Sequence, residues 1–262
     1  MPEPKSDQPR SVRRLEFADA REAADLGAFL GRLIHYDRAA AVRLQAGGGA
    51  LAVFGRPASF EVLAIRTARL AAPYELDVTV SAGELLEAVD ERTGHAVVPA
   101  AVTGPPWAGV LPPRGGWRQV AGLPGEGAMR GALSAAVAEF RSRDEQLPSG
   151  SRTRAERDRI GREIWSRTLG DTQLPLRAVH AAQSLGFLRP VRTMVPAPAP
   201  APAHAGSGTA SASASASASA SGSASPEPVA LLESGSWLRL RTPYGSIALR
   251  RAGLGALSVT PA

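Results

Sequence analysis

The chain has 262 residues, no cysteine, and 30 basic against 24 acidic residues; Lys5 is its only lysine. The lack of cysteine excludes disulfides, thiolate nucleophiles and cysteine-bound metal sites, and it favours a reducing, cytoplasmic compartment. No apolar run approaches the roughly 18 residues that cross a bilayer, so we expect no membrane segment. The start of the chain lacks the apolar core of a signal peptide, and we predict that residues 1–14 are disordered.

The net charge of +6 lies in the second half of the chain. Residues 1–125 carry 14 basic and 14 acidic side chains, whereas residues 126–262 carry 16 and 10. Arginine in a chain also rich in alanine, glycine and proline is typical of GC-rich coding, which weakens the link from charge to nucleic acid. If a nucleic acid or an acidic protein is a partner, we expect it at the basic C-terminal half.

Residues 15–98 predict an α+β module that begins with a helix from about Ala18 to Asp37. Its apolar residues recur at helical spacing: Leu26, Phe29, Leu30, Leu33 and Ile34. A hairpin follows, with alternating apolar residues on both sides of "GGG" at 47–49. Strands from Ser59 and from Tyr74 then complete a four-stranded antiparallel meander.

The module is expected to close with a second helix. Ser81 and Glu84 form an S-x-x-E capping box, in which each side chain accepts a free backbone N–H of the first turn. We expect this helix to reach Arg92 and to stop at Gly94.

Residues 99–125 are rich in proline and glycine but contain Trp107 and Trp117. A solvated linker rarely carries two tryptophans, so we predict an ordered strap over apolar surface. The alternative is a proline-rich ligand for an aromatic groove. Residues 126–190 predict a helical module with helices at about 126–142, 153–169 and 175–187.

Residues 191–228 form a low-complexity alanine, serine and proline linker that has nothing to bury, and we predict that it is disordered. The final segment, residues 229–262, predicts a C-terminal β-hairpin in which Arg241 pairs with Ser246. This register places four apolar residues on one face: Leu238, Leu240, Ile247 and Leu249. Since an isolated hairpin is marginal, it must dock on the helices or on the N-terminal sheet, with its arginines facing water.

Three helices followed by a basic hairpin have the order of a winged-helix domain, which reads DNA with its third helix and its wing. On this interpretation Arg177, His180 and Gln183, with Ser184, face the groove. Three arginines of the hairpin would contact phosphates: Arg239, Arg241 and Arg250. The third helix is short of polar side chains, and a linker this long before a wing is unusual, which favours solvated arginines instead.

Catalytic motifs are missing from the sequence. It has four histidines and no zinc-protease, serine-hydrolase or phosphate-loop motif, so we predict no metal site, no cofactor and no enzymatic activity. His35 and Asp37 are the densest pair of reactive residues, and a helix end with its following turn explains both.

These observations favour a non-catalytic cytoplasmic binding or interaction protein. A nucleic-acid-binding regulator is the first alternative. A small-molecule-binding module, with a site between the sheet and the first helix, is the second.

Four stretches resemble a family of proteins from high-GC actinobacteria. They are "FLGRLIHYDRAAAVRLQAGGGALAVFGRP", "LDVTVSAGELL", "PPRGGWRQV" and "WLRLRTPYGS". The resemblance covers nearly all of the chain outside the linker and implies a bacterial, cytoplasmic protein. It brings no activity, fold or site residue that could be assigned to this chain.

Overall fold

A computed structural model describes residues 13–189 and 228–251 of the chain. The predicted α+β class is confirmed. The predictions of disorder for residues 1–14 and 191–228 lie almost wholly outside the described residues, as does the part of the predicted hairpin segment beyond Arg251.

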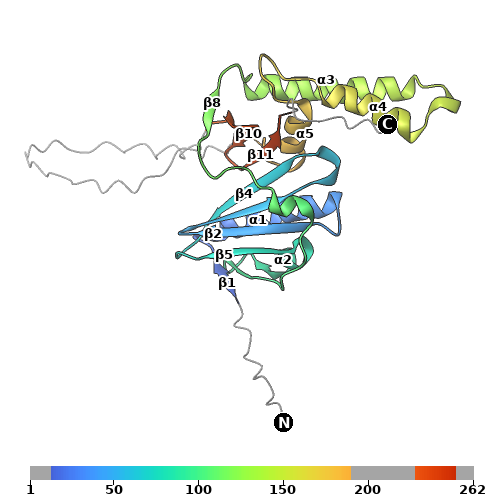
Figure 1. Ribbon diagram of the computed structural model, residues 1–262. Coiled ribbons are helices and arrows are strands. Elements are labelled where there is room, and N and C mark those ends of the chain that lie inside the picture. The colour runs from blue at the N-terminus through green and yellow to red at the C-terminus, as the bar shows by residue number, and fades with distance from the viewer. Residues whose placement is uncertain (1–12, 190–227, 252–262) are drawn as a thin grey trace, which may run out of the picture.

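The centre of the fold is an antiparallel sheet of eight strands within the described residues. In the order in which they lie side by side, they are β5 (Leu76–Ser81), β2 (Ala41–Gly47), β3 (Ala50–Gly55), β4 (Leu63–Arg69), β11 (Gly245–Arg250), β10 (Trp237–Thr242), β9 (Ala230–Ser234) and β8 (Arg118–Val120). Figure 1 shows β4 of the N-terminal part next to β11 of the C-terminal end. Residues nearly two hundred positions apart therefore meet in the middle of one sheet.

One face of this sheet is covered by α1 (Ala20–Tyr36), α2 (Ala82–Ala88) and α5 (Leu176–Ser184). Two further helices, α3 (Glu126–Glu145) and α4 (Arg154–Trp165), pack on α5. The 3-10 turns are η1 (Ala58–Phe60), η2 (Pro106–Gly109) and η3 (Ser149–Ser151). A smaller sheet, not predicted from the sequence, has the order β1 (Arg14–Glu16), β7 (His95–Val97) and β6 (Val89–Asp90).

The first helix and hairpin form as their sequences predict. Asp19 caps α1 by accepting a hydrogen bond from the backbone N–H of Glu22, and the apolar stripe of the helix is buried apart from the partly buried Ile34. The turn between β2 and β3 places Gly48 at φ 60°, a conformation that glycine adopts at little cost.

The strand order differs from the expected meander at β5. After β4 the chain passes the β2–β3 turn, where the backbone N–H of Leu70 donates to Gly49 and that of Tyr74 donates to Gly48. This docking carries β5 back to the free edge of β2 instead of to β4. The edge of β4 is thereby left available to β11.

Several predicted boundaries are wrong. Among the helices of residues 126–190, α4 ends at Trp165 instead of at about 169, and α5 ends at Ser184 instead of at about 187. The strand expected from Ser59 begins at Leu63, because η1 and a left-handed Glu61 occupy the first residues of that segment. The capped helix begins as predicted, since the Ser81 hydroxyl accepts from the Glu84 N–H. It ends at Ala88 because the next two residues pair with β7.

The C-terminal hairpin has the predicted register, with Arg241 opposite Ser246. Its predicted apolar face is buried in the core that also contains residues of α1 and α5. The sequence allowed docking on the helices or on the N-terminal sheet, and the hairpin contacts both. β11 pairs with β4 of the N-terminal sheet, and the buried face of the hairpin packs against α5. β9, a third strand, was not predicted, and β8 extends the sheet beyond it.

Residues 99–125 cross the sheet face opposite the helices. The segment starts at β5, where the Val102 N–H donates to the Thr79 carbonyl, and ends by pairing β8 with β9. Between these edges Trp107 and Leu111 pack against a second apolar cluster that includes Phe54 and Ile65. We call residues 99–125 the strap.

The expectation that the three hairpin arginines face water is wrong for two of them. Arg239 and Arg241 are half-buried on the strap face, and their Nε atoms are buried. The Arg239 guanidinium lies 5.7 Å from the ring centroid of Trp117. Only Arg250 is exposed, and it lies 5.2 Å from the ring of Trp237.

A buried ionic network joins the two halves of the sheet on the helix side. Arg66 of β4 is 7% exposed, and it donates to the Tyr244 carbonyl at 2.7 Å and to Asp25 of α1 at 3.1 Å. Asp25 also accepts from Arg189, whose guanidinium stacks 4.0 Å from the Tyr244 ring centroid. Burial lowers the pKa of Arg66, while Asp25 and Glu22 oppose this shift.

The helices α3 and α4 lie side by side and extend away from the sheet (Figure 1). Arg143 bridges them by donating to Glu163 at 2.8 Å, and this contact lowers the pKa of Glu163 to about 2. Two i,i+4 ion pairs lie along α4, each at 3.8 Å: Arg154 with Asp158 and Arg159 with Glu163. The arginines of this region are therefore largely matched by carboxylates of the same helices.

Candidate functional site

A cleft of about 510 Å³ lies where the end of α1 and the η1 turn face α4 and α5. Five aromatic side chains line it: Tyr36, Phe60, Phe140, Trp165 and His180. Five charged residues also line it: Glu61, Arg157, Asp158, Arg162 and Arg177. The cleft thus combines an apolar, aromatic wall with guanidinium groups. We call it the aromatic cleft.

Four of the five aromatic side chains form a continuous row. The ring centroids of Tyr36 and Phe60 are 5.2 Å apart, and those of Phe60 and His180 are 5.0 Å apart, both edge to face. His180 stacks on Trp165 at 4.5 Å. Because these contacts join α1, η1, α4 and α5, the wall has a fixed shape before any ligand arrives.

The arginines of the cleft differ in how well they are paired. Arg157 donates to Asp144 at 2.7 Å. Arg177 has a buried Nε with no hydrogen-bond partner in the described part of the chain. Arg162 is exposed and makes no ion pair with any residue that the structure describes. Arg162 and Arg177 are therefore the guanidinium groups of the lining that no carboxylate of the described residues neutralises, and an anion entering the cleft would supply that partner.

His180 is a neutral group at neutral pH. Burial lowers its pKa, and its ring contacts are Phe60 and Trp165. The unfolded chain takes up this proton near pH 6.5, before the folded chain does, so acidification below about 6.5 favours unfolding.

When the pH falls from about 7.5 to about 5.5, we expect the free energy of unfolding to decrease less in His180→Gln than in the wild-type chain. Urea denaturation at each pH measures this difference. Equal losses in the two proteins would contradict the prediction.

The backbone of the η1 loop is strained at Glu61. This residue has φ 53° and ψ 37°, and it is the one non-glycine residue with positive φ among those that the structure describes. The left-handed conformation costs a residue with a side chain about 1–2 kcal/mol, which the surrounding contacts of Phe60 and Val62 must offset.

We therefore expect Glu61→Gly to raise the free energy of unfolding by about 0.5–1 kcal/mol, because glycine removes the strain but adds chain entropy to the unfolded state. Glu61→Ala removes the carboxylate and keeps the strain, so it controls for charge. Chemical denaturation of both variants tests the prediction, and a glycine variant less stable than the alanine variant would refute it.

The structure divides the predicted nucleic-acid-binding residues between two faces of the sheet. Arg177 and His180 lie together in the aromatic cleft, on the helix side, while Gln183 is exposed further along α5. The other three lie on the strap side: Arg239, Arg241 and Arg250. Nucleic-acid binding stays a prediction, but these six residues do not form one surface.

The space between the sheet and α1, where the sequence placed a small-molecule site, is filled. Leu26, Phe29, Leu30 and Leu33 are buried there in the main core. The aromatic cleft begins instead at the C-terminal end of α1, at Tyr36.

His35 and Asp37 have the roles that the helix end and turn explain. The Asp37 carboxylate accepts from the Ala39 N–H at 2.9 Å, which fixes the turn into β2. The His35 ring lies edge-on to Tyr36 at 5.4 Å.

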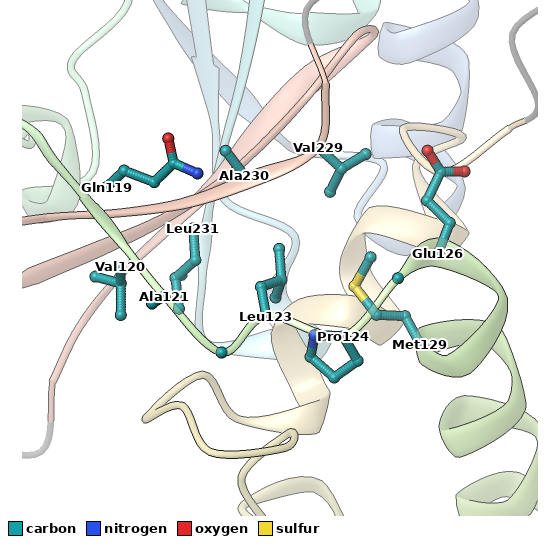
Figure 2. Close-up of a pocket in the computed structure, with 12 residues that line it drawn as sticks. Gln119, Val120, Ala121, Leu123, Pro124, Glu126, Met129, Val229, Ala230 and Leu231 are labelled. Atoms are coloured by element: carbon teal, nitrogen blue, oxygen red, sulfur yellow. The ribbon is translucent and has the colours of Figure 1, made fainter.

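Figure 2 shows a smaller pocket of about 300 Å³ between the start of α3 and β9. Its polar side chains are Gln119 and Glu126, which lie at opposite ends of the view. Leu123, Met129 and Leu231 occupy the space between them. This pocket brings no pair of polar groups together, so the aromatic cleft is the stronger candidate.

Within residues 13–189 and 228–251, no three histidine or acidic side chains gather as a metal site would require. The helices of those same ranges include none long and apolar enough to cross a membrane.

Two family models match the chain. Residues 10–109 match the domain of unknown function DUF8010, and residues 112–254, more than half of the chain, match the domain of unknown function DUF8185. The chain belongs to the DUF8185 family. No curated protein and no solved structure matches it.

The boundary between the DUF8010 and DUF8185 matches falls inside the strap, next to η2. The sheet does not divide there, because β4 of the DUF8010 part pairs with β11 of the DUF8185 part. The aromatic cleft also takes residues from both: Tyr36 and Phe60 from the first, Trp165 and His180 from the second. The candidate site therefore exists only when both parts are present.

Proposed function

We propose that the protein is a non-catalytic binding protein whose aromatic cleft holds a small ligand with a planar apolar part and an anionic group. The observation that carries this proposal is that Arg162 and Arg177 line the cleft without an ion pair among the described residues, beside the stacked rings of His180 and Trp165. Guanidinium groups without a carboxylate partner lack the acceptor that a carboxylate, sulfonate or phosphate group would supply.

The size and lining of the cleft support a small molecule. Its volume of about 510 Å³ lies within the range usual for sites that bury small ligands. Aromatic rings favour a planar ligand by stacking, and arginine recognises planar or tetrahedral anions through its forked donors. The neutral imidazole of His180 adds one donor or acceptor without adding charge.

The arrangement favours binding over catalysis. General acid–base catalysis needs a histidine or carboxylate oriented by a hydrogen-bonded partner. The contacts of His180 among the described residues are with aromatic rings, and Asp158 faces Arg154 at 3.8 Å. The cysteine-free composition and the actinobacterial resemblance support a bacterial cytoplasm as the location.

The test uses anilinonaphthalene sulfonate, a planar apolar probe with one anionic group whose fluorescence rises on binding. The wild-type chain is expected to bind it, and Arg162→Ala combined with Arg177→Ala is expected to weaken binding at least tenfold. Fluorescence titration at low and physiological salt measures both affinities.

Arg154→Ala is the matched control, because Arg154 lies on α4, as Arg162 does, and its side chain is 95% exposed. It is not expected to change the affinity. The proposal fails if the probe does not bind the folded chain, or if the double variant and the control bind it equally well. Circular dichroism of each variant confirms that the fold is retained, since the probe also binds partly unfolded chains.

A further inference from the structure

A second hollow lies on the strap side of the sheet, between η2 and the open end of the C-terminal hairpin. Its volume is about 410 Å³, and two tryptophans line it: Trp107 of the strap and Trp237 of β10. We call this hollow the tryptophan groove. It lies apart from the aromatic cleft, although Glu61 of the η1 loop borders both.

The floor of the groove consists of buried residues, whereas the side chains of its walls are partly exposed to solvent. Leu63 and Ala248 are buried beneath it, in the apolar cluster that anchors the strap. Trp107 and Trp237 are only partly buried, and the neighbouring Val110 is 48% exposed. Large apolar side chains gathered in one exposed hollow on a firm support are typical of an interaction site.

The rim of the groove is cationic. Arg56 and Arg250 are both exposed, and neither forms an ion pair with a carboxylate in the part of the chain that the structure describes. Arg250 lies 5.2 Å from the Trp237 ring, a contact that keeps its charge at the edge of the groove. Glu61 is the one acidic residue of the lining, so the groove carries a net positive charge.

We propose that the tryptophan groove docks a short acidic peptide segment of a partner protein, which inserts one aliphatic or aromatic side chain between Trp107 and Trp237. Its volume admits one or two side chains and is too small for a folded domain. Arg56 and Arg250 complement carboxylates on either side of that anchor.

The lining favours a peptide over a single-stranded nucleic acid. Nucleic-acid grooves follow the phosphate backbone with a track of cations, whereas this rim has two arginines and one carboxylate. Val110 adds exposed aliphatic surface to the lining, which suits an apolar side chain better than a stacked base. The proposal concerns a second site and does not depend on a ligand in the aromatic cleft.

The experiment selects peptides from a random dodecapeptide library displayed on phage, with the intact chain as the target. We expect the selected sequences to be rich in aspartate and glutamate around a leucine, phenylalanine or tryptophan. A selected peptide, synthesised with a fluorescein label, is then titrated with the intact chain and followed by fluorescence anisotropy.

Arg56→Glu combined with Arg250→Glu is expected to weaken this peptide at least tenfold, and Val110→Asp is expected to weaken it as well. All three positions are exposed, so the fold should be retained. Arg154→Glu, at an exposed position on α4 outside the groove, is expected to leave the affinity unchanged.

Three outcomes would overturn the proposal: no sequence enriched by selection, enriched sequences without acidic residues, or an affinity that the groove variants do not change. Displacement of the selected peptide by oligothymidylate from the wild-type chain would also overturn it, in favour of a nucleic-acid site. Failure of the sulfonate probe to bind the aromatic cleft would leave it intact, because the two tests use different residues.

Discussion

Replacing Phe29 by alanine is expected to lower the free energy of unfolding by about 3–5 kcal/mol. Phe29 is 1% exposed in the main core, and its ring stacks on Phe187 with centroids 5.7 Å apart. The contact joins α1 to the segment that follows α5, so the variant leaves a cavity between the two family-matched parts. Urea denaturation followed by circular dichroism measures the loss.

Val97→Ala is the control for Phe29→Ala, since Val97 is 37% exposed and its truncation is expected to change stability by less than about 0.5 kcal/mol. We also expect one unfolding transition in the wild-type chain, because one sheet and one core include both parts. Two separate transitions, with only the first shifted by Phe29→Ala, would show that the parts unfold independently.

Arg66→Ala is expected to cost about 3–5 kcal/mol, for an electrostatic reason. The guanidinium is almost fully buried and donates to Asp25 and to the Tyr244 carbonyl. Its removal leaves a half-buried carboxylate and a buried carbonyl with fewer donors, in a region of low dielectric. Equilibrium denaturation measures the loss.

Arg69→Ala tests whether burial is the cause. Arg69 lies on the same strand and contacts Asp19 and Glu22, but its side chain is 71% exposed. We expect a loss below about 1 kcal/mol, as for other exposed ion pairs. Similar losses for Arg66→Ala and Arg69→Ala would contradict the argument.

The local elements were predictable because their signals are short-range. The alternation of Leu238 and Leu240 with arginines, together with the Thr242–Gly245 turn, determined the hairpin register that the structure has. The glycine at 48 marked the β2–β3 turn, and the proline before α5 marked the start of that helix.

The assembly of the sheet was not predictable by the same means. Nothing in the local pattern of Leu63–Arg69 indicates that its free edge accepts a strand from the other end of the chain. Short strands such as β6, β7 and β8 were not predicted either, since two or three residues are too few to show a periodic pattern.

The candidate site was predicted only in part. Arg177 and His180 were chosen as residues of one helix face, and the structure does place them together. Trp165 fell within the helix predicted at about 153–169, and Phe60 within the strand predicted from Ser59. Their role in the aromatic row follows from the packing of four elements, which one sequence does not reveal.

The pairing of β4 with β11 has a consequence for the newly made chain. Residues 63–65 can pair only after residues 246–248 have been synthesised. At about 5–20 residues per second, the edge of β4 therefore stays unpaired for roughly 10–40 s. An unpaired apolar strand edge is a site for association with other chains. Production of the protein in cells should therefore depend on chaperones that shield this edge, and a fragment that ends before residue 228 should aggregate.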